Sequence, residues 1–258
     1  GDLNLRLFGD TVRLDVNAFI KNQNPVFYFR HFQSKHYWWD NNDLSKIMRT
    51  RLEGKLSLDR WGTQLRAGVE NIKNYTYLAN TSIPVKDSEG NVTGFKNNAA
   101  VRQHSGNIQI FTAMLQQKLK VGIFHLDGEV AYQKSSEQDI LPLPELSAYG
   151  NLYMKFGLAK KVLQIEMGAD VRYFSKYYAP DYSPVIGQFY NQNPDDKIEI
   201  GAFPIVNVYA NLHLKRTRFF IMMYHVNAGS GKSNYFLAPH YPINPRMIKF
   251  GLSWNFFD

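Results

Sequence analysis

The sequence predicts an all-β protein, and three observations lead to this prediction. Aromatic residues make up 15% of the 258 residues, and no tract is rich in helix-forming residues. Apolar and polar side chains alternate with a period of two from one end of the chain to the other. No change in composition marks a linker, so we expect residues 1–258 to form a single domain.

The alternation is clearest in residues 163–173, which read LQIEMGADVRY and place apolar side chains at the odd positions. Residues 11–21 and 49–58 show the same pattern, with a strongly charged second face. Other segments carry apolar residues in both phases, so their faces stay unassigned: 26–39, 107–115 and 219–226. The candidate strands number about twelve and cover residues 2–8, 11–21, 26–39, 46–58, 62–78, 103–117, 121–133, 147–159, 162–178, 203–215, 217–226 and 246–257.

The connections between these strands alternate in length. Tight turns are expected at 59–61, 119–120, 160–161 and 216. Long connections rich in Asn, Pro, Gly, Ser and Asp are expected near 79–102, 134–146, 179–202 and 227–245. Bacterial outer-membrane barrels have short periplasmic turns and longer extracellular loops. We therefore expect a transmembrane antiparallel β-barrel, with about twelve strands in this chain and about 12–16 in the full barrel, and with a periplasmic C-terminus.

Two features favour a membrane barrel over a soluble one. Most of the candidate strands are about 9–16 residues long, whereas globular strands most often have about 5–6 residues. Aromatic residues also gather at strand ends, as the girdles at a membrane interface require. The aromatic residues expected at the interface are Trp38, Trp39, Trp61, Tyr177, Tyr178, Trp254, Phe256 and Phe257. No apolar run reaches the roughly 20 residues that a spanning helix needs.

In a membrane barrel the polar face of each strand lines the lumen. The residues expected to line a pore are Arg13, Asp15, Arg49, Arg51, Glu53, Lys55, Arg66, Glu70, Asp127, Glu129, Glu166, Asp170, Arg172, Asn207 and Asn211. Their mixed signs suit small polar solutes, and we expect a mild anion preference. Alternatively, these charges pair with one another and fill a narrow barrel. The net charge of +8 comes largely from basic residues at the tight turns, which we expect to meet lipid headgroups.

Four blocks of residues, in order along the chain, resemble one known family. They are residues 36–42 (HYWWDNN), the segment 182–192, the segment 201–204 (GAFP), and Tyr241-Pro242 leading into the end at 251–258 (GLSWNFFD). These blocks are similar to those of the Bacteroidetes putative porin family. The resemblance implies an outer-membrane β-barrel more firmly than it implies a transported solute. Members of that family are longer at the N-terminus, so the chain resembles the C-terminal portion of one.

Candidate chemistry is weak throughout the chain. The segment 229–233 (GSGKS) imitates a phosphate-binding loop, but it lacks the glycine spacing, and a proline-rich stretch follows where a helix is needed. His125 and Asp127 share a strand face without a nucleophile placed beside them. The acidic residues at 40–43 and 195–196 lack the spacing of a calcium loop. The chain has no Cys. We expect no enzyme activity, no metal and no cofactor.

These patterns predict a porin in the outer membrane of a Gram-negative bacterium, through which small hydrophilic solutes or ions diffuse passively. Its expected partners are the lipid bilayer, lipopolysaccharide and small polar solutes, and not nucleic acid. The alternative is a non-conducting barrel that serves as a scaffold or partner in an outer-membrane complex. A third reading is a soluble lipocalin-like binder.

Overall fold

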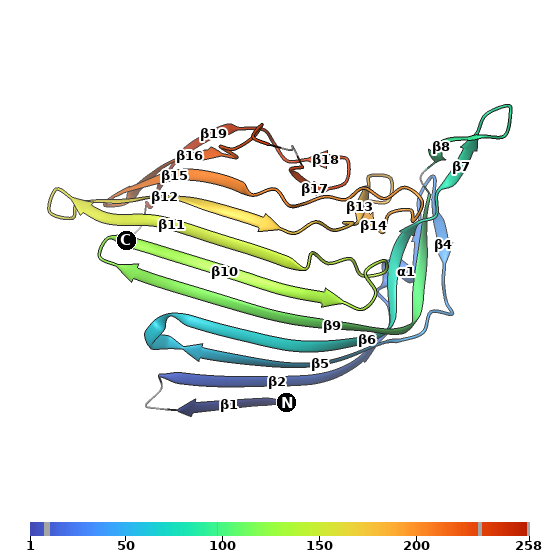
Figure 1. Cartoon of the computed structure of the whole chain (residues 1–258), viewed down its shortest axis with the longest axis horizontal. Coiled ribbons are helices and arrows are strands. Elements are labelled where there is room, and N and C mark those ends of the chain that lie inside the picture. Colours follow the sequence, from blue (N-terminus) through green and yellow to red (C-terminus); the bar gives the residue numbers. More distant parts are fainter. Residues whose placement is uncertain (8–10, 97, 232–233, 257–258) are drawn as a thin grey trace.

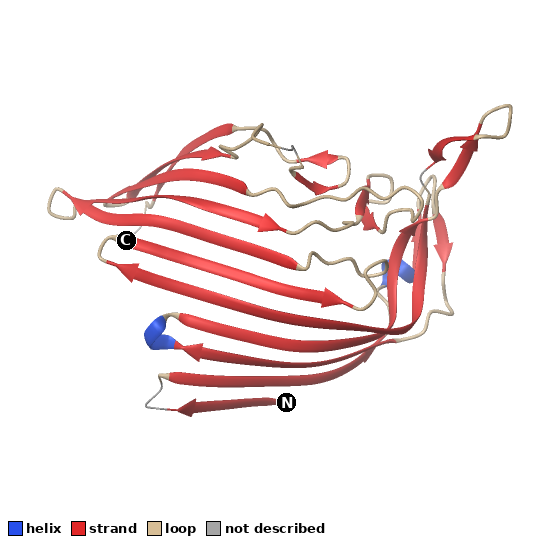
Figure 2. Cartoon of the chain, in the orientation of Figure 1, coloured by secondary structure: helices blue, strands red, loops and turns tan. Residues whose placement is uncertain are grey.

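The computed structural model describes residues 1–7, 11–96, 98–231 and 234–256. Among these residues, eleven strands form one antiparallel sheet in which each strand pairs with the next sheet strand along the chain. The sheet is wide and curved, like part of a barrel wall (Figure 1, Figure 2). Its edges are β1 (Asp2–Leu7) and β19 (Met247–Trp254), and no pairing between described residues joins them. The predicted all-β antiparallel fold is confirmed, with the sheet open.

Between the two edge strands, the sheet contains, in order, β2 (Val12–Gln23), β5 (Ile47–Leu58), β6 (Thr63–Asn80), β9 (Ala99–Val121), β10 (Phe124–Ser135), β11 (Leu146–Leu158), β12 (Leu163–Phe174), β15 (Ile205–Leu214) and β16 (Thr217–Tyr224). Four small hairpins lie outside it: β3 (His31–Gln33) with β4 (Trp38–Asp40), β7 (Ile83–Lys86) with β8 (Val92–Lys96), β13 (Asp181–Ser183) with β14 (Gln188–Tyr190), and β17 (Phe236–Ala238) with β18 (Tyr241–Pro242). Eleven of the expected strands correspond to the sheet strands within a few residues.

The strand expected over residues 26–39 is wrong. This segment forms a short helix, α1 (Phe27–Arg30), followed by the β3–β4 hairpin, and lies in the connection between β2 and β5. Its apolar residues occur in both phases because they pack on one another and against a buried cluster that includes Leu78 of β6 and Ala99 of β9. The ring of Phe32 lies 4.8 Å from that of Tyr28 and 4.6 Å from that of Trp39. Strand periodicity could not distinguish this local aromatic cluster from a spanning strand.

Because residues 26–39 are not a sheet strand, short and long connections alternate regularly along the chain. The short connections are 8–11, 59–62, 122–123, 159–162 and 215–216, and the long ones are 24–46, 81–98, 136–145, 175–204 and 225–246. The turn expected at 119–120 is misplaced, because β9 continues to Val121 and turns at Gly122, whose φ is +61°. All the long connections lie at one end of the sheet, which we call the loop end. The short connections define the turn end (Figure 1).

β6 and β9 are the longest strands, with 18 and 23 residues. A strand crosses a bilayer with about 9–11 residues, so these two continue well beyond the span at the loop end. Figure 1 shows them rising there beside α1 and the β13–β14 hairpin. This extension provides the surface on which the long connections pack.

The strand register separates the sheet into two faces. Residues directly opposite one another in antiparallel strands have side chains on the same side. Leu14, Leu56, Leu65, Leu115 and Val130 are opposite one another in five successive strands, so they form one continuous apolar row. We call this side of the sheet the apolar face, and the opposite side the polar face.

Large apolar side chains on the apolar face are not covered by other parts of the chain. Val69 is 53% exposed, Leu152 is 59% exposed and Ile221 is 52% exposed. A surface of this size and polarity on a soluble monomer would be unfavourable in water. In an outer-membrane barrel, the apolar band contacts hydrocarbon and the exposure is required.

Candidate functional site

The register places all of the residues predicted to line a pore on the polar face. Asp15 is opposite Lys55, and Lys55 is opposite Arg66, so the charged residues of β2, β5 and β6 share one side. Asp170 is opposite Asn151 on β11 and Asn207 on β15, which joins the second half of the set. The full set is Arg13, Asp15, Arg49, Arg51, Glu53, Lys55, Arg66, Glu70, Asp127, Glu129, Glu166, Asp170, Arg172, Asn207 and Asn211. That this face lines a pore stays a prediction.

Charges on β2, β5 and β6 form a network with an excess of basic groups. Arg49 Nε donates to Glu70 Oε1 at 2.7 Å. Glu53 accepts from Arg51 and also lies 3.7 Å from Arg66 Nε. Of the predicted residues on these strands, five are basic (Arg13, Arg49, Arg51, Lys55 and Arg66) and three are acidic (Asp15, Glu53 and Glu70). This part of the polar face is therefore electropositive.

The part of the polar face on β10, β11, β12 and β15 has the opposite sign. Asn207 Nδ2 donates to Asp170 Oδ1 at 2.9 Å, and Lys155 Nζ lies 3.4 Å from Glu166 Oε2. Of the predicted residues on these strands, four are acidic (Asp127, Glu129, Glu166 and Asp170) and one is basic (Arg172). Separating the two signs onto different strands would produce a transverse field across a lumen.

The contacts between these charges run along the wall. Each ion pair named above joins residues on one strand or on neighbouring strands. Such contacts hold side chains against the sheet. Because the described strands form an open sheet, the alternative in which charges from opposite walls meet and fill the barrel stays a prediction.

The sequence reasoning missed four polar-face residues on β11 and β15: Tyr149, Asn151, Tyr153 and Tyr209. Tyr149 is opposite Arg172, Tyr153 is opposite His125, and Tyr209 donates from its hydroxyl to Asn151 Oδ1 at 3.1 Å. Residues 147–155 read SAYGNLYMK, so the period-two pattern contained the signal.

The long connection 175–204 crosses the loop end of the sheet. It leaves β12 and returns to β15, yet it pairs with β6, which lies beyond β11, β10 and β9 in the sheet order. The amide of Asn191 donates to Leu78 O at 2.8 Å, and Asn191 O accepts from the amide of Asn80 at 2.8 Å. This parallel bridge fixes the connection across the width of several strands.

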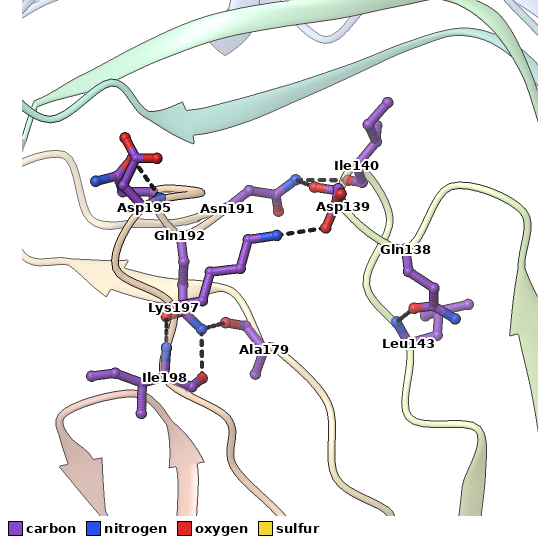
Figure 3. A network of polar contacts seen from close by, with 11 residues as sticks. Gln138, Asp139, Ile140, Leu143, Ala179, Asn191, Gln192, Asp195, Lys197 and Ile198 are labelled. Carbon is purple, nitrogen blue, oxygen red and sulfur yellow. Dashed lines mark hydrogen bonds and ion pairs between the residues drawn. The ribbon is translucent and has the colours of Figure 1, made fainter.

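Side chains tie this connection to its neighbour, residues 136–145 (Figure 3). Asn191 Nδ2 donates to Asp139 O at 3.1 Å and to Ile140 O at 2.8 Å, and Lys197 Nζ lies 2.5 Å from Asp139 Oδ1. Gln192 braces the connection from within by donating to the carbonyls of Ala179 and Ile198. Asn191 therefore joins connection 175–204 both to connection 136–145 and to β6.

An aromatic cluster completes this assembly, which we call the loop cap: connections 24–46, 136–145, 175–204 and 225–246. Tyr190 is buried against Leu78 of β6, and the Tyr28 hydroxyl donates to Ile186 O at 2.9 Å. At the other side, His240 Nδ1 lies 3.1 Å from Asp181 Oδ2. The loop cap therefore contacts both halves of the loop end.

Raising the pH above 10 is expected to loosen the loop cap. Burial, with the charge of Asp181 as a smaller cause, raises the pKa of Tyr190 from 10.0 to about 12. The unfolded segment loses the tyrosine proton at a lower pH than the folded loop cap does. The contribution of Tyr190 to the stability of the loop cap is therefore complete below pH 10 and falls as the pH rises through about 12. The rate of proteinase K cleavage within 175–204 should increase between pH 9 and 11.5.

Two variants separate this titration from a general effect of base. In Tyr190→Phe the cleavage rate should depend less steeply on pH, because the buried group no longer ionises. Tyr178→Phe, at an exposed position in the same connection, should behave like the unchanged protein. An equal pH dependence in all three proteins would contradict this assignment.

The aromatic residues predicted at the interface lie at both ends. Trp61, Trp254 and Phe256 are exposed at the turn end. Tyr177 and Tyr178 lie past the end of β12, in connection 175–204, and so do not end a sheet strand. Trp38 and Trp39 lie in the β3–β4 hairpin and not in a spanning strand. The indole of Trp39 donates to Tyr28 O at 2.8 Å within the loop cap. Phe257 lies outside the described residues. A role at the interface stays a prediction for the set.

The minor chemical candidates gain no support. The segment 229–233 lies partly outside the described residues, and β17 is the next element after it. His125 stacks on Tyr153, with ring centroids 4.9 Å apart. In the part of the chain that the structure describes, no group of three His, Asp or Glu residues could hold a metal ion. Within the same residues, no helix is long and apolar enough to cross a bilayer.

Comparisons with known proteins agree with this architecture. A family model described as "Putative porin" matches residues 1–258. No curated protein matches the chain in sequence.

Solved structures share the fold at low sequence identity. The siderophore receptor PirA from Acinetobacter baumannii has a TM-score of 0.63 at 9% identity, covering 98% of this chain and 40% of that one. The ferric enterobactin receptor PfeA from Pseudomonas aeruginosa has 0.62 at 14%, covering 97% and 39%. The FrpB iron transporter from Neisseria meningitidis has 0.60 at 13%, covering 96% and 37%. The chain thus spans about two fifths of the length of these proteins.

Proposed function

Because the chain belongs, over residues 1–258, to the family described as "Putative porin", we propose that it lets small hydrophilic solutes or ions diffuse passively through a polar lumen. The protein is a β-barrel protein of the outer membrane of a Gram-negative bacterium, surrounded by lipid and lipopolysaccharide. In this proposal, residues 1–258 act as a single barrel domain without a chemical step, a cofactor or a nucleic-acid partner.

One observation carries the proposal: the charged residues predicted to line a pore all fall on one face of the sheet, and the opposite face is largely apolar. A barrel that only anchored a partner would not need charged residues on several neighbouring strands of its inner face. The segregation of basic residues on β2, β5 and β6 from acidic residues on β10 to β15 further supports an aqueous lumen, since an excess of charges of one sign is costly without water.

A second candidate is a non-conducting barrel that serves as a scaffold in an outer-membrane complex. The loop cap favours it, because connection 175–204 is bonded across the loop end instead of standing free. The receptors with a similar fold are named for siderophores and iron. At this identity the likeness concerns the fold and does not assign those ligands to this chain.

Planar-bilayer conductance of the purified, detergent-refolded full-length protein separates the two functions. We expect stable unitary current steps, whose reversal potential in a salt gradient reports the charge preference. Heat-modifiable gel mobility serves as the folding control. Folded protein that inserts and stays electrically silent would favour the scaffold function and reject diffusion.

A further inference from the structure

We propose that the polar face of β10, β11, β12 and β15 carries a saccharide-binding site. The inference rests on the proposed function, because it assigns a solute class to the same polar face. Its centre is a row of alternating carboxylates and amides, flanked on both sides by tyrosine rings.

The polar row contains Asp127, Asn151, Asp170 and Asn207, which are directly opposite one another on four successive strands. Asn207 Nδ2 donates to Asp170 Oδ1, and Asn207 Oδ1 accepts from the amide of His225 at 2.9 Å. Asp170 and Asn207 are only 8% and 5% exposed. These two buried residues therefore hold the row in place, and the part-exposed Asp127 and Asn151 offer a carboxylate acceptor next to an amide group that both donates and accepts.

Tyrosine rings flank the row at two levels. Toward the loop end lies Tyr149, and the Arg172 guanidinium is 5.8 Å from the centroid of its ring. Toward the turn end, Tyr153 and Tyr209 are opposite the same residue, Gly168. The hydroxyl of Tyr209 donates to Asn151 of the row at 3.1 Å. The rings are thus fixed beside the carboxylates and amides.

Gly168 allows this arrangement of rings. A Cβ atom at this position would lie 2.5 Å from Tyr153 Cβ and 2.5 Å from Leu152 O, so any side chain there would displace the ring. On the other side, His125 of β10 is opposite Tyr153 and stacks on its ring at an interplanar angle of 12°, which supports the ring. The polar face is also hollowed beside Tyr149, by about 410 Å³ lined by Glu129, Ser147, Ala148, Tyr149 and Arg172.

This combination matches the chemistry of a sugar. A pyranose presents an apolar C–H face, which packs on an aromatic ring, and an edge of hydroxyls, which carboxylates and amides bind in pairs. From Tyr149 to Tyr153 the strand rises about 13 Å, a length that two or three linked sugar rings would cover. The excess of acidic groups disfavours phosphorylated solutes and nucleotides.

Maltotriose serves as the probe in planar bilayers containing the full-length protein. We expect it to interrupt the ionic current in a saturable manner, whereas a polyethylene glycol of similar mass should not. Tyr149→Ala and Tyr153→Ala should each raise the half-saturating concentration about tenfold, the loss of one stacked ring. Phe19→Ala is the matched control, because Phe19 is opposite Arg51 on the distant β2–β5 part of the polar face, and should leave it unchanged.

Equal interruption by the polyethylene glycol, or no difference between the tyrosine variants and Phe19→Ala, would overturn the saccharide site while leaving the pore intact. Interruption by putrescine but not by maltotriose would also overturn it, since the carboxylates would then act as a cation site. If the protein conducts no current, the proposed function fails. The site is then tested by saturation-transfer NMR of maltotriose with the detergent-solubilised protein, where loss of signal in Tyr153→Ala supports it and absence of signal in the unchanged protein rejects it.

Discussion

Replacing Leu152 by arginine in the middle of β11 is expected to lower the free energy of unfolding by about 2–4 kcal/mol. Leu152 is opposite Leu126 and Ala169 on the apolar face, with 59% of its surface exposed. In the membrane this surface contacts hydrocarbon, so a guanidinium there would have to draw water or headgroups inward. Urea unfolding in phospholipid vesicles, followed by tryptophan fluorescence, measures the change.

The matched control is Asn151→Arg, which introduces the same charge at the next position of the same strand, on the polar face. It should cost only about 1 kcal/mol, the loss of the hydrogen bond that Asn151 accepts from Tyr209, because the new charge itself faces water. Leu56→Arg, on the apolar face of β5, should behave like Leu152→Arg. Equal, large losses at positions 151 and 152 would contradict the assignment of the two faces.

Reversing the charge of Arg51 is expected to raise the concentration of cations near this position of the pore about fivefold and to lower that of anions by the same factor. At about 8 Å in water, one unit charge changes the energy of a passing ion by about 0.5 kcal/mol, and a reversal doubles the change. Arg51→Glu would also place a third carboxylate beside Glu53 and Glu70. Reversal potentials measured in a salt gradient at low ionic strength, where screening is weak, report the shift.

Arg51→Gln removes the charge without reversing it and should give about half of the energetic change. Arg172→Glu, on the acidic half of the polar face, should shift the preference in the same direction. Both variants should keep the heat-modifiable mobility of the folded barrel. An unchanged reversal potential in conducting Arg51→Glu channels would show that Arg51 does not face the ion path.

The strands and their faces could be predicted because both follow from local pattern. In β12, a single reading of residues 163–173 gave the strand and the side of Glu166 and Asp170, since neighbouring residues point in opposite directions. The same rule failed at residues 26–39, where Tyr28, Phe32 and Trp39 pack on one another across a hairpin. Periodicity indicates which side of a strand is apolar, whereas here the apolar side chains form a local cluster that packs against Leu78 and Ala99.

The loop cap could not be predicted, because its contacts join residues far apart in the sequence. Nothing near Asn191 indicates that its backbone pairs with Leu78 or that its side chain reaches the carbonyls of Asp139 and Ile140. These bonds form because the curvature of the sheet brings β6 close to connection 175–204. The polar row beside Tyr153 and Tyr209 was within reach of the pattern, and only its assembly across four strands required the structure.

The number of strands determines how the wall can be completed. Each of the ten junctions between the eleven sheet strands reverses direction, so β1 and β19 run the same way. Joining them directly would create one parallel seam. A second copy in the same membrane orientation would not avoid this, because both of its edge strands run in that same direction. A cylinder with antiparallel neighbours throughout requires an odd number of further strands between β19 and β1.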